Sequence, residues 1–216
     1  MLTIHLKQFD LKSLSLSVIT HNIYMMKHIY IFPRYSGDED SDWYQRAKQE
    51  IMIRDTSVIV NPLSLPNWDN PDITTFLSFI ERRLPQNEID SNTYFVGHSV
   101  GCKAALLYLS ELQKKNKSLK IGGLMCVAGW WTIDTPWPQL EQWINISVDY
   151  EKIKEICNHN IVTLISDNDP FTSDTLTNKK LWEEKVNAKV RIVHDAKHFN
   201  TDGLAAILDE LLLFCR

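Results

Sequence analysis

The sequence of 216 residues has no apolar run close to the ~20 residues that a membrane-spanning helix requires. Its first dozen residues contain Lys7, Asp10 and Lys12 and lack the continuous apolar stretch of a secretory signal peptide. The formal net charge is -4 at pH 7, and no long block of one sign is present. These features argue against nucleic acid or a membrane surface as a partner, and we expect a cytoplasmic protein.

Cysteine is also scarce, and this excludes several kinds of site. The four cysteines form no Cys-x-x-Cys pair, and none lies near histidines at zinc-finger spacing. Cys102 and Cys126 fall within apolar helix and strand patterns, so we expect both to be buried in a reducing compartment. Glycine-rich nucleotide-binding motifs and a P-loop lysine are missing, which makes a nucleotide-binding protein a weak hypothesis. We expect no cofactor and no metal.

Short β-branched and aromatic runs alternate with segments of helical periodicity along most of the chain. This alternation predicts a mostly parallel sheet of about six strands with helices on both faces and a minimal cap domain or none. The expected strands are 28–32, 57–60, 94–96, 121–127, 160–165 and 190–193. The expected helices are 41–53, 71–84, 102–117, 178–186 and 204–212, the second capped by Asn70 and opened by Pro71.

Residues 1–24 do not fit this pattern. Apolar residues such as Leu2, Ile4 and Leu6 alternate with polar ones, as in an edge strand. The pair Met25-Met26, directly before the first core strand, instead resembles a translation start. Both interpretations stay open: an N-terminal extension that is dispensable, or an added hairpin. We expect residues 25–216 to form a single domain.

The segment 93–109 carries the most informative motif. An apolar strand pattern leads into Gly97-His98-Ser99-Val100-Gly101, and a helix pattern follows. A serine at the apex of a strand-to-helix turn needs unusual backbone angles and close neighbours, and the two glycines permit both. This Gly-x-Ser-x-Gly turn is typical of the nucleophile of α/β-hydrolases, whereas His98 is expected only to pack.

Two further strand ends supply a base and an acid for Ser99. Asp169 follows the fifth expected strand and His198 the sixth, in the order Ser, Asp, His. A serine hydroxyl needs a base, and a buried carboxylate would orient the histidine. Asp167 and His194 are rivals. We favour Asp169 because the Asp-Pro pair stands at the usual distance after the strand, and His198 because His194 lies at the strand end.

These segments, with Asp42-Trp43 and Asn61-Pro62, resemble the small α/β-hydrolase family of serine hydrolases that includes YdeN and retinoblastoma-binding protein 9. The resemblance covers about residues 26–216. It implies a compact α/β-hydrolase fold, a triad of Ser99, Asp169 and His198, and no cofactor.

The loop after the first strand departs from that family. Pro33-Arg34 stands where a glycine-rich loop is common, and proline has no amide to donate. We expect the oxyanion hole to use the Val100 amide together with that of Arg34 or Tyr35.

Aromatic residues follow the strand ends near this site. Trp130, Trp131 and Phe171 are candidates for the lining of a substrate pocket, or they pack loops. We expect a serine hydrolase that cleaves small carboxylic esters, thioesters or amides. The alternative is a hydrolase-fold module that binds a small ligand or a protein with weak or no turnover; the sequence does not name a protein partner.

Overall fold

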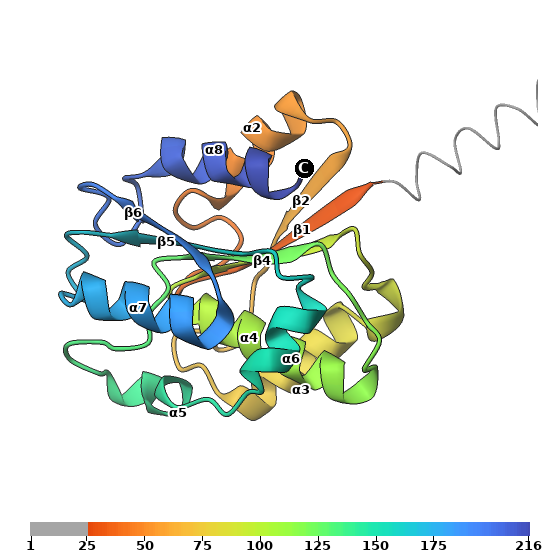
Figure 1. Ribbon diagram of the computed structural model, residues 1–216, viewed down its shortest axis with the longest axis horizontal. Coiled ribbons are helices and arrows are strands. Elements are labelled where there is room, and N and C mark those ends of the chain that lie inside the picture. The colour runs from red at the N-terminus through yellow and green to blue at the C-terminus, as the bar shows by residue number, and fades with distance from the viewer. Residues whose placement is uncertain (1–25) are drawn as a thin grey trace, which may run out of the picture.

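Six parallel strands form the centre of the structure, a computed structural model that describes residues 26–216 (Figure 1). They lie in the order β2-β1-β3-β4-β5-β6, and the parallel sheet of six strands confirms the predicted α/β fold. Their bounds are β1 Lys27–Phe32, β2 Val58–Pro62, β3 Thr93–His98, β4 Gly123–Val127, β5 Ile161–Ser166 and β6 Lys189–Val193. The expectation for residues 1–24 lies outside the described residues.

Helices cover both faces of the sheet (Figure 1). On one face lie α2 Tyr44–Arg54 and α8 Leu204–Phe214. On the other lie α3 Ile73–Arg83, α4 Val100–Lys115, α6 Tyr150–Ile156 and α7 Thr175–Val186. For the helices that connect strands, the division follows from right-handed crossovers, because the chain moves one way from β1 to β2 and the opposite way from β2 to β6.

The reversal of direction places a crevice beyond the ends of β1 and β3. These strands pair directly, with Phe32 opposite Gly97 at their carboxyl ends. In open α/β sheets, ligands bind at such a switch point. The loop after β1 and the turn after β3 therefore meet where a site is expected.

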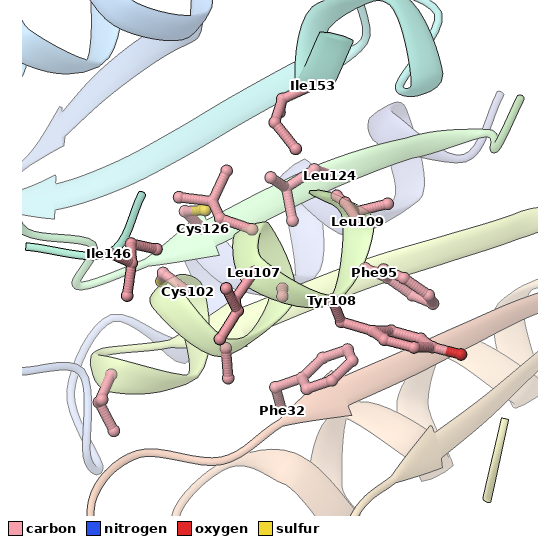
Figure 2. Packing of buried hydrophobic residues seen from close by; sticks show 14 of the residues in the cluster. Phe32, Phe95, Cys102, Leu107, Tyr108, Leu109, Leu124, Cys126, Ile146 and Ile153 are labelled. Carbon is pink, nitrogen blue, oxygen red and sulfur yellow. The ribbon is translucent and has the colours of Figure 1, made fainter. Parts of the chain in front are cut away.

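Helix α4 is buried over most of its length, which a single apolar stripe would not require. Figure 2 shows Cys102, Leu107, Tyr108 and Leu109 packed among side chains from the sheet and neighbouring helices. The sequence predicted a single apolar face on α4. The buried surface is wider than that, because α3, α6 and the short helix α5 Glu141–Ile144 cover its remaining sides. Burial of Cys102 and Cys126 is confirmed, and all four cysteines are free.

Among the helix starts that differ from the predictions, two are set by aspartate caps. Helix α3 begins at Ile73 rather than Pro71, because the extended Asp72 accepts a hydrogen bond from the Thr75 amide at 2.7 Å and so acts as the N-cap. Helix α7 begins at Thr175, three residues before the expected Asn178, because Asp174 caps it in the same way.

The segment after β4 contains short helical elements where the sequence analysis expected no helix. It contains the 3₁₀ turn Pro138–Leu140, the short helix α5 Glu141–Ile144 and then α6. It packs against the loop before α3, where Trp143 Nε1 donates to the carbonyl of Pro71 at 2.7 Å. Among the described helices, none is long and apolar enough to cross a bilayer.

Candidate active site

Ser99 occupies a strained turn between β3 and α4. Its backbone angles are φ 56° and ψ -120°, a combination that costs about 1–3 kcal/mol and that the surrounding structure must hold. The Ser99 amide donates to the carbonyl of Val127 at 2.9 Å, which ties the turn to β4. The strain presents the side chain at the carboxyl edge of the sheet, as predicted from the glycine-flanked motif.

Both flanking glycines are needed for close approach rather than for a left-handed backbone. A Cβ at Gly97 would lie 2.4 Å from the Cα of Cys102, so the strand and the helix could not meet there. A Cβ at Gly101 would lie 2.2 Å from the carbonyl oxygen of Phe32. Gly101 therefore lets the start of α4 touch the end of β1, which brings the loop after β1 to Ser99.

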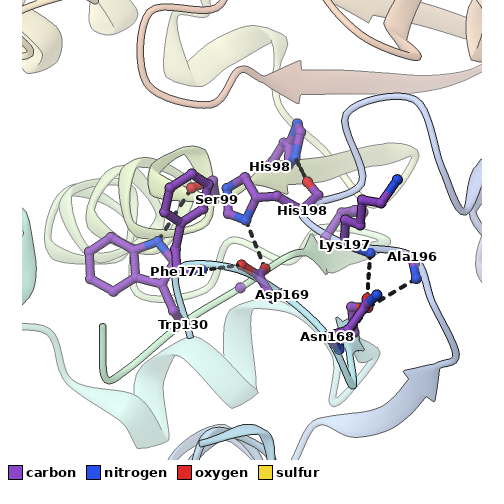
Figure 3. A network of polar contacts seen from close by, with 12 residues as sticks. His98, Ser99, Trp130, Asn168, Asp169, Phe171, Ala196, Lys197 and His198 are labelled. Atoms are coloured by element: carbon purple, nitrogen blue, oxygen red, sulfur yellow. Dashed lines mark hydrogen bonds and ion pairs between the residues drawn. The ribbon is translucent and has the colours of Figure 1, made fainter. Parts of the chain in front are cut away.

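Asp169 and His198 form a buried hydrogen-bonded pair beside this turn (Figure 3). The distance between His198 Nδ1 and Asp169 Oδ2 is 2.7 Å, and the other carboxylate oxygen accepts from the Phe171 amide at 2.9 Å. A carboxylate only accepts, so Nδ1 of His198 carries the proton and Nε2 is left as the basic nitrogen. In Figure 3 this second nitrogen lies on the side of Ser99.

The Ser99 hydroxyl also faces an indole. Trp130 Nε1 donates to Ser99 Oγ at 3.4 Å, and the Trp130 side chain is buried (Figure 3). Ser99, Trp130, His198 and Phe171 line one cavity of about 170 Å³. The remaining lining residues are Arg34, Tyr35, Ser36, Ile133, Trp137, Leu140 and Asn200.

The structure separates the three aromatic candidates. Trp130 and Phe171 line the cavity at Ser99, and the Phe171 ring meets the His198 ring edge-on with centroids 4.7 Å apart. Trp131 turns away: it packs on Trp182 and lines a different cavity with Tyr150 and Lys185. The sequence could not distinguish two adjacent tryptophans, whose side chains leave the backbone in different directions.

The rival residues Asp167 and His194 also form a hydrogen-bonded pair, but this pair lies on the surface. His194 Nδ1 lies 2.6 Å from Asp167 Oδ2, and the side chains are 92% and 39% exposed, respectively. The hydrogen bond raises the pKa of His194 and lowers that of Asp167. The cavity at Ser99 is lined by neither residue.

Arg34 and Tyr35 of the loop after β1 line the cavity at Ser99, and the amide of Arg34 already has a partner. The Arg34 amide donates to the Tyr44 hydroxyl at 3.0 Å. Tyr35 is the next residue, and it also lines the cavity. Val100 begins α4, so its amide belongs to the free donors at the helix N-terminus.

His98 has a polar role that the sequence analysis missed. Its side chain is fully buried, where Nδ1 lies 2.8 Å from Tyr44 Oη and Nε2 lies 2.8 Å from the carbonyl oxygen of His198. Burial lowers the pKa of His98 well below its usual value, so the ring is neutral. The motif histidine thus links α2 to the backbone of His198, and only the adjacency of His98 to Ser99 could have signalled this.

A buried lysine supports the tryptophan that faces Ser99. Lys103 lies one turn into α4, with Nζ 4.0 Å from the ring centre of Trp131 and 4.9 Å from that of Trp130. Nζ also donates to the Ile144 carbonyl at 3.4 Å. Burial lowers the pKa of Lys103 to about 7. The lysine therefore connects α4 to the segment that walls the cavity.

The family model described as Serine hydrolase matches residues 29–207. YdeN of Bacillus subtilis, named as a hydrolase, is 27% identical over 180 residues, which cover 82% of this chain and 88% of YdeN. The crystal structure of the B. subtilis ydeN product superposes with a TM-score of 0.73 at 26% identity, covering 88% of this chain and 98% of that one.

More distant structures share the fold. Est1E from Butyrivibrio proteoclasticus has a TM-score of 0.65 at 11% identity, covering 91% of this chain and 90% of that one. The RedJ thioesterase from Streptomyces coelicolor has a TM-score of 0.60 at 13% identity, with 89% and 92% covered. At these identities the likeness concerns the fold alone.

Proposed function

The chain belongs to the serine hydrolase family, and from this premise we propose that it cleaves small carboxylic esters through Ser99, His198 and Asp169, by way of an acyl-enzyme. The observation that carries the proposal is the buried Asp169–His198 hydrogen bond of 2.7 Å beside a serine in a strained strand-to-helix turn. Thioesters and amides present the same carbonyl to the site and belong to the same proposal.

The reaction follows from the protonation states of these groups. His198 Nε2 takes the proton of Ser99 Oγ as the oxygen bonds to the carbonyl carbon, and the carbonyl oxygen becomes an oxyanion. When the oxyanion collapses, the bond to the leaving oxygen breaks and the proton on Nε2 passes to the departing alcohol. Water then repeats both steps on the acyl-enzyme and releases the acid. Asp169 keeps Nδ1 protonated and stabilises the imidazolium.

We assign the oxyanion to the amides of Val100 and Tyr35. The Val100 amide points from the N-terminus of α4, where the helix dipole also favours negative charge. Tyr35 is preferred to Arg34 because the Arg34 amide is committed to Tyr44 at 3.0 Å. One such donor contributes about 3–4 kcal/mol to transition-state stabilisation.

The size of the cavity supports short acyl or aryl groups. Its volume is about 170 Å³, and an engineered apolar cavity of ~150 Å³ in another protein holds benzene. Trp130, Trp137 and Phe171 supply apolar walls. A series of p-nitrophenyl esters should therefore show kcat/KM highest at short acyl chains; a rise toward long chains would contradict this.

A fluorophosphonate probe tests the central assignment. Its phosphorus should bond to Ser99 Oγ with loss of fluoride, and peptide mapping should find the label on Ser99. Ser99→Ala should remove the label and the esterase activity together. A wild-type protein that neither labels nor turns over any ester, while it binds a small acyl ligand, would support the binding-module alternative instead.

A further inference from the structure

Two hydrogen-bonded chains join the loop after β1 to the loop that carries His198. The two loops leave different strands, and the backbone alone does not connect them. Both chains pass through Arg34, which stands where the resemblance to the family leads one to expect a glycine-rich loop. They are formed largely by buried polar groups, so their geometry is strongly determined.

The first chain has only one consistent set of proton positions. The carbonyl of His198 only accepts, so His98 Nε2 donates to it and His98 Nδ1 accepts from Tyr44, each over 2.8 Å. Burial raises the pKa of Tyr44 and keeps its hydroxyl protonated. The same hydroxyl accepts from the Arg34 amide at 3.0 Å. Each hydrogen bond of this chain is therefore donated in the same direction, from the loop after β1 toward the backbone of His198. Figure 3 shows the last of them, between His98 and the His198 carbonyl.

The second chain uses the Arg34 side chain. Its Nε lies 2.7 Å from Asp42 Oδ2, and its Nη2 lies 3.2 Å from Asp42 Oδ1. The same Oδ1 accepts from Asn200 Nδ2 at 2.9 Å, two residues after His198. The Asp42 side chain is only 6% exposed, which reduces the screening of this ion pair, whose hydrogen bond runs from Nη2 to Oδ1.

Building on the proposed function, we propose that Arg34, Asp42, Tyr44, His98 and Asn200 form a clamp that positions the oxyanion amide of Tyr35 relative to His198. Asp42, Tyr44 and His98 act as positioning residues, since the described residues that line the cavity include none of them.

The clamp explains how a loop beginning with proline serves this chemistry. Pro33 has no amide hydrogen, so one backbone anchor of the loop is missing. The amide and the guanidinium of Arg34 supply anchors on two sides instead. Precision matters because a displacement of ~1 Å at a reacting group costs roughly a hundredfold in rate.

Two conservative substitutions break one chain each. Tyr44→Phe removes the hydroxyl of the first chain, and Asp42→Asn weakens the second while keeping a residue that tolerates the left-handed φ of 54°. Each should lower kcat at least about tenfold and leave KM within about threefold, because the substrate contacts remain. Because both chains act on one loop, the double variant should lose less than the product of the two losses.

Matched controls separate positioning from stability. Tyr108→Phe removes a buried hydroxyl that donates to the Leu84 carbonyl, and Glu210→Gln removes a buried carboxylate 3.5 Å from Arg191. Both lie away from the cavity, so kcat should stay within about twofold even where Tm falls. Three results would each overturn the proposal. These are equal losses of kcat in the controls and the clamp variants, a rise in KM instead of a fall in kcat in the clamp variants, and clamp variants with unchanged kinetics.

A second measurement does not depend on turnover. Amide hydrogen exchange in residues 34–37 and 194–200 should accelerate in Tyr44→Phe and Asp42→Asn and stay unchanged in the controls. If the wild type neither labels nor hydrolyses esters, the proposed function fails while exchange still decides whether the clamp exists. If the wild type reacts and exchange in both loops is unaffected, the clamp alone is wrong.

Discussion

Two aspartate–histidine pairs lie after the same two strands of this protein, and their local bonding is nearly identical. In each, a carboxylate Oδ2 meets the histidine Nδ1, at 2.7 Å for Asp169–His198 and at 2.6 Å for Asp167–His194. In each, the second carboxylate oxygen accepts from a backbone amide at 2.9 Å. Hydrogen-bond geometry alone therefore does not distinguish a candidate catalytic pair from a surface pair.

Burial and the presence of Ser99 nearby distinguish the two pairs. The Asp169 and His198 side chains are 2% and 8% exposed, and His198 borders the cavity that holds Ser99. His194 is 92% exposed, where water screens its attraction to Asp167. A carboxylate shielded from water holds one tautomer of a histidine more firmly than a solvated carboxylate does.

The largest expected effect comes from removing the two histidines in turn. His198→Ala should lower kcat/KM by at least about three orders of magnitude, because losing the base costs nearly as much as losing the whole triad. His194→Ala should stay within about twofold, as exposed substitutions usually do. Ester hydrolysis at a fixed pH measures both. A larger loss of kcat/KM in His194→Ala than in His198→Ala would show that the exposed pair, and not the buried one, supplies the base.

The next effect separates the two acids. Asp169→Asn should lower kcat/KM by about a hundredfold or more, though less than His198→Ala, because the amide favours the wrong histidine tautomer. Asp167→Asn should change it by no more than about twofold. The matched substitutions differ only in burial and position, so equal losses would show that the acid is misassigned.

The fold was within reach of the sequence because each element carries a local signal. Six strands and the turn at Ser99 follow from apolar periodicity and from two glycines, and the structure confirms the sheet. Asp169 and His198 could be placed at one sheet edge by topology alone. The choice of Asp169 and His198 over Asp167 and His194 depends on their spacing from the strand ends, because the sequence does not show which of these side chains are exposed.

The clamp and the lysine support were not predictable in the same way. Tyr44 lies within the expected helix 41–53 without a local signal of a polar role, and Asp42 was used only in the Asp42-Trp43 pair of the family resemblance. Lys103 stands on a helix face where a lysine normally indicates solvent, yet two indoles enclose it. Such roles depend on contacts between residues far apart in the chain, for example the 158 positions that separate Asp42 and Asn200.

The smallest expected effect concerns the pH dependence of the surface pair. The hydrogen bond to Asp167 raises the pKa of His194, so the pair stabilises the fold below the unfolded histidine pKa of about 6.5 and this contribution is lost as pH rises through the folded value. The lowered pKa of Asp167 sets the acid limit: its contribution is present above about pH 4 and is lost as pH falls through the folded value. The stabilising window of the pair therefore lies between about pH 4 and 6.5.

In an NMR titration, Asp167→Asn should move the His194 midpoint down toward the ordinary histidine pKa of about 6.5, while kcat/KM keeps its pH profile because His194 does not border the cavity. A change in the activity profile with this substitution would mean that the exposed pair acts on the site after all, and that burial does not separate the two pairs.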